Sequence, residues 1–78
     1  MEKILYEIVL LRATGLFLNT ISYYEENKAS LTDDSIAFVA VLEVFKATVE
    51  YRDIGLIKKY AALVAVKEPG LPSIQEYL

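Results

Sequence analysis

Apolar residues between positions 2 and 27 recur at spacings of three and four, which place side chains on one face of a helix. They form three such seams, and the seams lie on different faces of the same helix. The first is Ile4, Ile8, Leu11, Gly15 and Leu18, the second is Leu5, Val9 and Leu16, and the third is Leu10, Phe17, Ile21 and Tyr24. The pattern predicts one long helix over residues 2–27 that is apolar on most of its faces.

A helix that is apolar on most faces is surrounded by protein. In a chain of three helices, no helix can be enclosed by the other two alone, so the remaining apolar surface needs a further contact. We therefore expect a second chain to complete the fold. Two residues qualify this prediction. Gly15 inside a helix costs up to about 1 kcal/mol relative to alanine, which allows either a kink or a close helix approach. Arg12 either pairs with a carboxylate or extends to solvent.

A second helix is predicted to begin at Thr32, a favoured N-cap residue that is followed by two aspartates in the first turn. It extends to about Asp53 or Ile54, because one narrow polar stripe recurs at spacings of three and four along an otherwise apolar stretch. The stripe consists of Glu43, Lys46, Glu50 and Asp53. Gly55 is the expected residue just past the helix end.

A third helix is predicted over residues 56–67, and the proline and glycine residues of segment 69–72 end it. Beyond them, Ser73 and Glu76 have the spacing of a capping box. This spacing favours a turn or two of helix at the C-terminus. The apolar side chains of this tail either dock on the tail's own domain or reach a neighbouring chain.

The amino-acid composition also favours association of the chain with a partner. The chain has 78 residues, which predicts a single helical domain over residues 1–78. Hydrophobic residues make up 55% of it and the mean hydropathy is +0.36, against an apolar share of roughly 45–50% in typical soluble domains. Cysteine and histidine are absent, so neither a disulfide nor the commonest zinc ligands can stabilise the fold. Small domains without such aids usually rely on a partner.

A membrane location is not expected. A spanning helix needs about 20 largely apolar residues, and charged residues interrupt both long apolar stretches. These residues are Lys3, Glu7, Arg12, Glu43, Lys46 and Glu50. The first three residues lack the basic-then-apolar layout of a signal peptide. The expected location is therefore the cytoplasm.

Candidate chemistry is sparse. Nucleophile–base pairs that need histidine or cysteine are impossible. The acidic pair at 25–26 is expected at a solvated helix end, the pair at 33–34 at a helix cap, and Glu43 and Glu50 on a solvated face. The three glycines are isolated, so no phosphate-binding loop is present. We expect no enzymatic activity, no cofactor and no metal site.

Nucleic-acid binding is also not expected. The net charge is −3, which gives no long-range attraction to a phosphate backbone. The segment over residues 73–78 is too short for a recognition helix and carries no lysine or arginine. Lys58, Lys59 and Lys67 are too few for a basic footprint.

The predicted interface is the third seam of the first helix, because it borders polar positions and therefore lies near the solvent edge. It comprises Leu10, Phe17, Ile21 and Tyr24. Tyrosines, of which the chain has six, are favoured at such boundaries.

The sequence thus predicts an all-α protein: a bundle of three helices plus a short C-terminal helix or arm, completed by oligomerisation. Its expected partner is a copy of itself, in a homodimer or larger assembly, with another protein as a further possibility. The predicted function is non-enzymatic protein–protein interaction or self-assembly, structural or regulatory. The alternatives are a carrier of a small apolar ligand and a small DNA-binding regulator.

Overall fold

A computed structural model describes residues 2–78, and this part of the chain is helical and contains no strand. Its elements are α1 (Glu2–Ala13), α2 (Phe17–Asn27), the 3-10 turn η1 (Lys28–Ser30), α3 (Asp34–Tyr51), α4 (Ile54–Lys67) and α5 (Pro72–Gln75). The all-α prediction is confirmed. The expected number of long helices is wrong: the described chain has four rather than three, because α1 and α2 replace the single helix predicted over residues 2–27.

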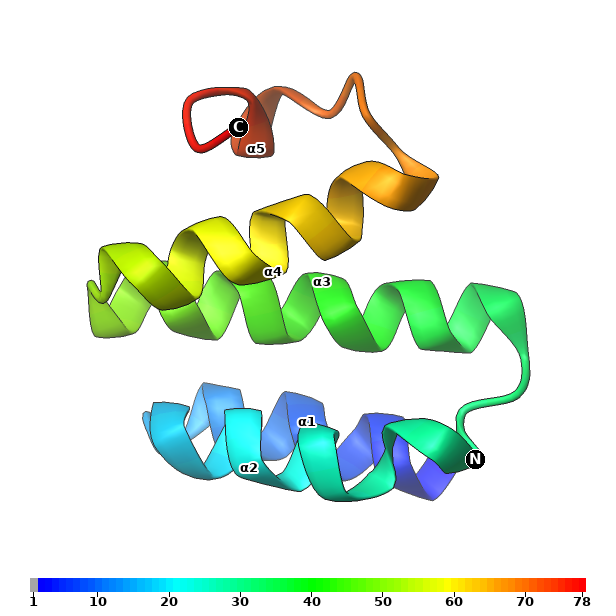
Figure 1. Ribbon diagram of the computed structural model, residues 1–78. Helices are drawn as coiled ribbons and strands as arrows, with labels where there is room; N and C mark the ends of the chain where they lie inside the picture. The colour runs from blue at the N-terminus through cyan, green and yellow to red at the C-terminus, as the bar shows by residue number, and fades with distance from the viewer. Residues whose placement is uncertain (1) are drawn as a thin grey trace.

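The long helix α3 lies in the middle of the molecule (Figure 1). The pair α1 and α2 lies on one side of α3 and α4 lies on the other, while the short α5 lies beyond α4. α3 contacts each of the other three long helices, and α1 and α2 also contact each other. The principal dimensions are 31 × 25 × 17 Å.

The chain reverses direction at Gly15, whose φ of +81° lies in the left-handed region that favours glycine. The backbone N–H of Gly15 donates to the carbonyl of Arg12, and that of Leu16 donates to the carbonyl of Leu11, both at 3.0 Å. This pair of hydrogen bonds is a Schellman motif, which ends a helix by satisfying its last carbonyl groups. Gly15 therefore ends α1 instead of lying within a longer helix.

Two other helix ends differ from the sequence prediction. Asp33, not Thr32, caps α3, and its side chain accepts a hydrogen bond from the backbone N–H of Ile36 at 3.0 Å. At the other end of α3, Arg52 adopts the left-handed conformation with φ of 65°. The prediction that Gly55 lies just past the end of α3 is wrong, because Gly55 lies inside the first turn of α4.

The tail docks on its own domain. Ile74 of α5 is fully buried, and the ring of Tyr77 packs edge-on against that of Phe45 in α3, with centroids 6.0 Å apart. The predicted capping box is wrong, because α5 begins after Leu71 without any side-chain cap. Burial of apolar side chains therefore holds the tail in place.

The core is continuous from α1 to α5. Its largest fully buried side chains are Tyr60, Ile8, Ile74, Val44, Val64, Thr20 and Thr48. The two threonine hydroxyls donate to backbone carbonyls of Leu16 and Phe45, at 2.8 and 2.6 Å. The surface of 4765 Å² equals the roughly 4,800 Å² expected for a compact monomer of this mass. The fold-back at Gly15 thus lets one chain bury much of the apolar surface that the sequence pattern assigned to a partner.

Candidate interaction surface

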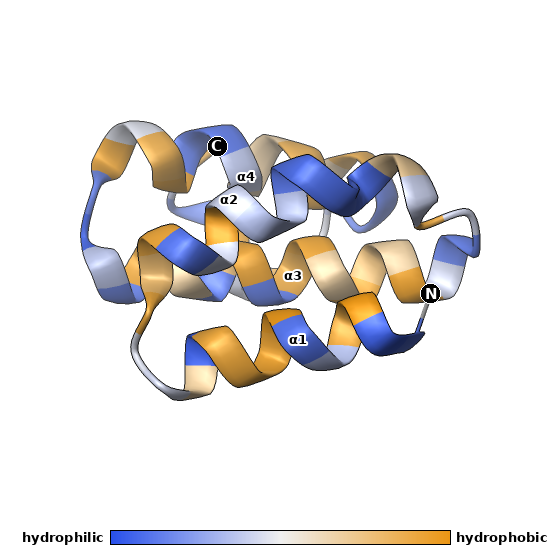
Figure 2. Ribbon diagram, turned by 90° about the horizontal axis from the view of Figure 1, so that it is seen from below, coloured by the Kyte–Doolittle hydropathy of each residue, from blue (hydrophilic) through white to orange (hydrophobic). Residues whose placement is uncertain are grey.

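The outward face of α1 carries a row of exposed apolar side chains. Tyr6 is 69% exposed, Val9 37% and Leu10 43%, and Ala13 is also exposed. These positions share one face of the helix because they are three and four residues apart. Figure 2 shows apolar residues along most of α1, which lies at the edge of the bundle. We refer to Tyr6, Val9, Leu10 and Ala13 as the α1 face.

The opposite side of α1 fixes this orientation. Ile8 is fully buried, and Ile4 and Leu5 pack against the core. Arg12 adds a polar link, because its Nε donates to the carboxylate of Glu43 on α3. The α1 face therefore points to solvent because the other side of the helix is bound to α3.

The environment of Arg12 corrects the expectation of a solvated position for Glu43, whereas Glu50 is 46% exposed. The Glu43 side chain is only 14% exposed, and Glu50 lies 3.4 Å from Nη1 of the same arginine. Of the two alternatives for Arg12, the structure thus shows pairing with carboxylates. These acidic groups balance a cation and hold two helices together.

Two further exposed apolar side chains follow α1 in the sequence, Leu16 in the turn and Leu18 at the start of α2. Leu16 is 48% exposed and Leu18 is 50% exposed. Together with Tyr51 at the end of α3, they help to line a shallow hollow of about 210 Å³. Within residues 2–78, five of the eleven large exposed apolar side chains lie between residues 6 and 18. This concentration makes the α1 face and its turn the leading candidate surface.

The four residues of the predicted interface do not form one seam. Leu10 lies on α1 and is exposed, whereas Phe17, Ile21 and Tyr24 lie on α2 and are partly buried. Ile21 and Tyr24 pack against the core, and the Tyr24 ring meets Tyr60 edge-on at 6.2 Å. The break at Gly15 separates Leu10 from the other three.

The sequence analysis did not single out Tyr6 and Val9, which are exposed on α1. The spacing of residues 6, 9, 10 and 13 carried a usable signal, because four apolar residues without a charge share one face. The all-round apolar character of the predicted long helix concealed that signal.

A second apolar hollow lies between α3 and α4. Its volume is about 250 Å³, and its lining consists of Tyr24, Asp34, Ala37, Phe38, Val41, Leu63, Val66 and Lys67. Lys67 and Asp34 approach to 3.9 Å at this site. We call it the Leu63 groove. Its volume is below the 300–1,000 Å³ typical of small-molecule sites.

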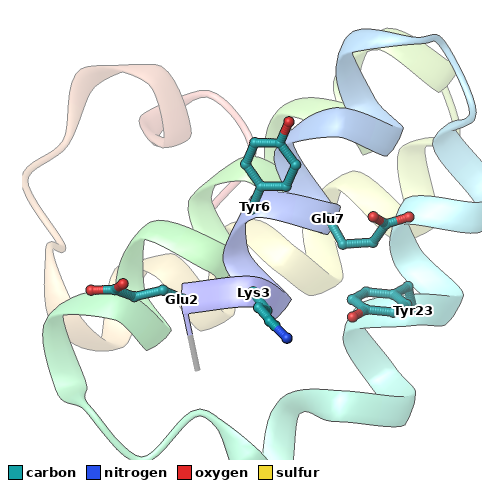
Figure 3. A pocket seen from close by; sticks show the side chains of 5 residues that line it. All are labelled: Glu2, Lys3, Tyr6, Glu7 and Tyr23. Atoms are coloured by element: carbon teal, nitrogen blue, oxygen red, sulfur yellow. The ribbon is translucent and has the colours of Figure 1, made fainter.

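A third recess lies between α1 and α2 (Figure 3). Its lining consists of Glu2, Lys3, Tyr6, Glu7 and Tyr23 around about 500 Å³. Figure 3 shows Glu2 and Tyr6 pointing away from Tyr23, so these side chains do not converge on one point. All the lining side chains are at least partly exposed. This arrangement lacks the enclosed, convergent polar groups that fix a ligand.

The most strongly perturbed titratable groups lie between α2 and α4. The hydroxyl of the buried Tyr60 donates to a carboxylate oxygen of Glu25 at 2.7 Å, and Lys28 donates to the other oxygen, also at 2.7 Å. The hydrogen bonds from Lys28 and Tyr60 lower the pKa of Glu25. Burial, followed by the hydrogen bond to Glu25, raises the pKa of Tyr60.

This cluster corrects the prediction that residues 25–26 are a solvated helix end. Glu26 is exposed, but Glu25 is partly buried and links α2 to α4. The Lys59 ammonium lies 5.2 Å from the centre of the Tyr60 ring. Every group in the cluster is satisfied by a neighbour in the same chain, so the cluster is accounted for by its role in holding helices together.

The described residues contain no group of three or more acidic side chains placed to bind a metal ion. In the same part of the chain, no helix combines the length and the apolar character needed to cross a bilayer.

Comparison with known proteins gives no relative: no family model, no curated protein and no solved structure is significantly similar to this chain.

Proposed function

We propose that this protein is a non-enzymatic interaction module that associates with a second copy of itself through the α1 face. The observation that supports this proposal is the row of exposed apolar side chains at Tyr6, Val9, Leu10 and Ala13. An exposed apolar patch of this kind, on a helix that is otherwise well packed, is a feature of protein-binding surfaces.

A two-fold arrangement suits this surface. Two copies of α1 packed antiparallel would bring the same apolar row of each chain together, which is the self-complementary contact of a symmetric dimer. A standard stable interface buries about 800 Å² on each partner. That is about one sixth of the 4765 Å² surface of this chain. The contact must therefore extend from α1 to Leu16 in the turn and Leu18 at the start of α2.

The test is the solution mass, measured by light scattering on a sizing column across a dilution series. The expected result is a dimer that dissociates on dilution. A monomer throughout the micromolar range would contradict the proposal.

Two variants locate the contact. Val9→Glu places a charge in the middle of the α1 face, and we expect it to weaken association at least tenfold, because an unpaired charge is costly to bury. Val66→Glu is the matched control, since Val66 is 83% exposed on α4 and lies in the Leu63 groove. Association that responds to Val66→Glu but not to Val9→Glu would assign the contact to the Leu63 groove instead.

The alternative function, carriage of a small apolar ligand, has weaker support. Compared with the recess between α1 and α2, the Leu63 groove is the more apolar site for such a ligand. Its volume of about 250 Å³ would enclose only part of a drug-sized molecule.

A further inference from the structure

The Leu63 groove is a second exposed apolar surface, separate from the α1 face. Figure 1 shows α1 and α4 on opposite sides of α3, and no residue of the α1 face lines the groove. Val66 of α4 is 83% exposed, more than any other large apolar side chain of residues 2–78, and Leu63, three residues before it, is 42% exposed. These two side chains therefore leave one wall of the groove open to solvent.

The helix that forms this wall is the most basic one in the described chain. Lys58, Lys59 and Lys67 are the only charged residues of α4, whereas the rest of the chain holds five basic and all eleven acidic residues. Lys58 and Lys59 form no ion pair within residues 2–78. Lys67 lies 3.9 Å from Asp34, but their side chains are 52% and 89% exposed, so solvent screens this pair. The chain's own carboxylates thus neutralise α4 only in part.

Two of these lysines stand at the ends of the exposed apolar pair. Lys59 and Lys67 are two helical turns apart, or about 12 Å along the axis of α4. Leu63 and Val66 lie between them at spacings of four and three from Lys59, on the same side of the helix. Phe38 of α3 helps to form the facing wall. A ligand that lies along this groove meets apolar surface in the middle and a positive charge at each end.

We propose that the Leu63 groove binds an acidic amphipathic helix of another protein, which lies along α4. Its aliphatic side chains enter the groove between Leu63 and Phe38, and two of its carboxylates, two turns apart, pair with Lys59 and Lys67. Docking of an amphipathic helix in an apolar groove is an established mode of recognition. Opposite charges at the rim of such a contact select the partner and speed its association.

The chain itself does not supply such a helix. Within its described helices, the acidic residues that are two turns apart are Glu43 and Glu50. Glu43 bonds to Arg12, and Glu50 lies 3.4 Å from the same arginine, so these carboxylates are already engaged. A bilayer surface is flat and cannot fill a concave groove, and the volume of about 250 Å³ is small for a small-molecule site. A helix of a different protein fits both the shape and the charge.

The experiment is a titration of the isotope-labelled full chain with synthetic helical peptides, followed by NMR. The probe peptide has glutamate at every seventh position and two adjacent leucines midway between successive glutamates, which places them all on one face of a helix. The control peptide has lysine in place of each glutamate. We expect saturable shifts at Leu63, Val66 and Phe38 with the glutamate peptide, at least tenfold weaker binding of the lysine peptide, and weaker binding of the glutamate peptide at high salt.

Three variants of the chain locate the contact. Val66→Glu should weaken binding of the glutamate peptide at least tenfold, because the new charge is costly to bury and repels the peptide. Lys67→Glu should weaken it at least threefold and reduce the preference for glutamate over lysine. Lys46→Glu makes the same change in net charge at an exposed position of α3 outside the groove, so it is the matched control and should leave binding unchanged. Val66 and Lys67 are exposed, so both variants should keep the fold.

Equal affinity for the two peptides, or shifts that leave out Leu63 and Val66, would overturn the proposal. Shifts in the groove that appear without peptide as the chain becomes more concentrated would assign the groove to a second copy and refute a foreign helix. Shifts there on addition of anionic lipid vesicles, with none on addition of the peptide, would assign it to a membrane surface instead. Val9→Glu should leave peptide binding unchanged, so this proposal and the one for the α1 face can fail separately.

Discussion

Residues with positive φ mark two of the helix ends that the sequence prediction placed wrongly, the C-terminal ends of α1 and α3. Gly15 adopts φ of +81° at no steric cost, whereas Arg52 adopts φ of 65° with a side chain present. The left-handed region costs a residue with a Cβ roughly 1–2 kcal/mol. The backbone N–H of Arg52 donates to the carbonyls of Thr48 and Val49, which offsets part of that cost. A helix end with positive φ therefore does not require glycine, and a glycine such as Gly55 does not by itself mark such an end.

Gly15→Ala tests only the cost of the left-handed backbone conformation for a residue with a side chain. No atom lies within 4 Å of an added Cβ at this position. We expect a loss of about 1–2 kcal/mol in the free energy of unfolding, measured by urea denaturation. Gly70→Ala is the matched control, since an added Cβ there also meets open space and Gly70 does not have a positive φ. A loss of stability that is equal in both variants would show that the conformation at Gly15 is not strained by a side chain.

The Glu25 carboxylate should make stability depend on pH. Its pKa in the folded chain lies below the ordinary value of 4.5, chiefly because Lys28 and Tyr60 donate hydrogen bonds to it. The stabilisation is therefore present above about pH 4.5 and is lost as the pH falls through the folded pKa. We expect the difference in melting temperature between the wild type and Glu25→Gln to be largest at neutral pH and to shrink below pH 4.5. Glu26→Gln is the control and should show no such trend.

At the scale of helices, the position of α1 depends on one charged contact as well as on apolar packing. Arg12 bonds to Glu43, whose side chain is 14% exposed, and lies 3.4 Å from Glu50, which is 46% exposed. The partly buried Glu43 is screened less by solvent than Glu50 and contributes more to the pairing.

A double-mutant cycle between Arg12→Ala and Glu43→Ala should give a coupling free energy of about 1 kcal/mol by thermal or chemical unfolding. A cycle between Lys46→Ala and Glu43→Ala is the control, since Lys46 is exposed and lies one turn from Glu43. Coupling of equal size in both cycles would mean that Arg12 contributes no specific link between α1 and α3.

Much of the helical structure could be predicted from the sequence. The stretches assigned to α3 and α4 agree with the prediction to within a few residues, because a polar stripe at helical spacing marks α3 and the proline and glycine residues of segment 69–72 bound α4. The break at Gly15 was not predicted, although glycine followed by an apolar residue is typical of a Schellman motif. Apolar seams at helical spacing run on both sides of Gly15, and they concealed the break. The partly buried positions of Phe17, Ile21 and Tyr24 follow from that one turn and could not be predicted without it.

At the scale of the whole molecule, the predicted long helix is incompatible with the observed dimensions. A continuous helix over residues 2–27 would be about 39 Å long, whereas the longest dimension of the molecule is 31 Å. A single chain could not cover its projecting end. Folding at Gly15 shortens the unit and encloses both halves against α3, and the exposed α1 face is what remains of the apolar surplus.

Self-association would link stability to concentration. If the folded chain forms a dimer, a tenfold rise in concentration should raise the melting temperature by roughly 3–5 °C, because association stabilises only the folded state. Val9→Glu should melt at a temperature that does not depend on concentration. A wild-type melting temperature that stays constant between about 5 and 500 µM would contradict dimerisation. This range covers roughly the concentrations at which a dimer with a micromolar dissociation constant forms.

The short connections between the helices have a consequence for how fast the chain folds. Three residues separate α1 from α2, and two separate α3 from α4, so most neighbouring helices in space are also neighbours in sequence. Proteins with such local contacts lose little chain entropy before they gain packing, and they fold in microseconds to milliseconds. This chain should therefore reach its native state quickly, and the α1 side chains that pack against the core, Ile4, Leu5 and Ile8, would spend little time exposed to water.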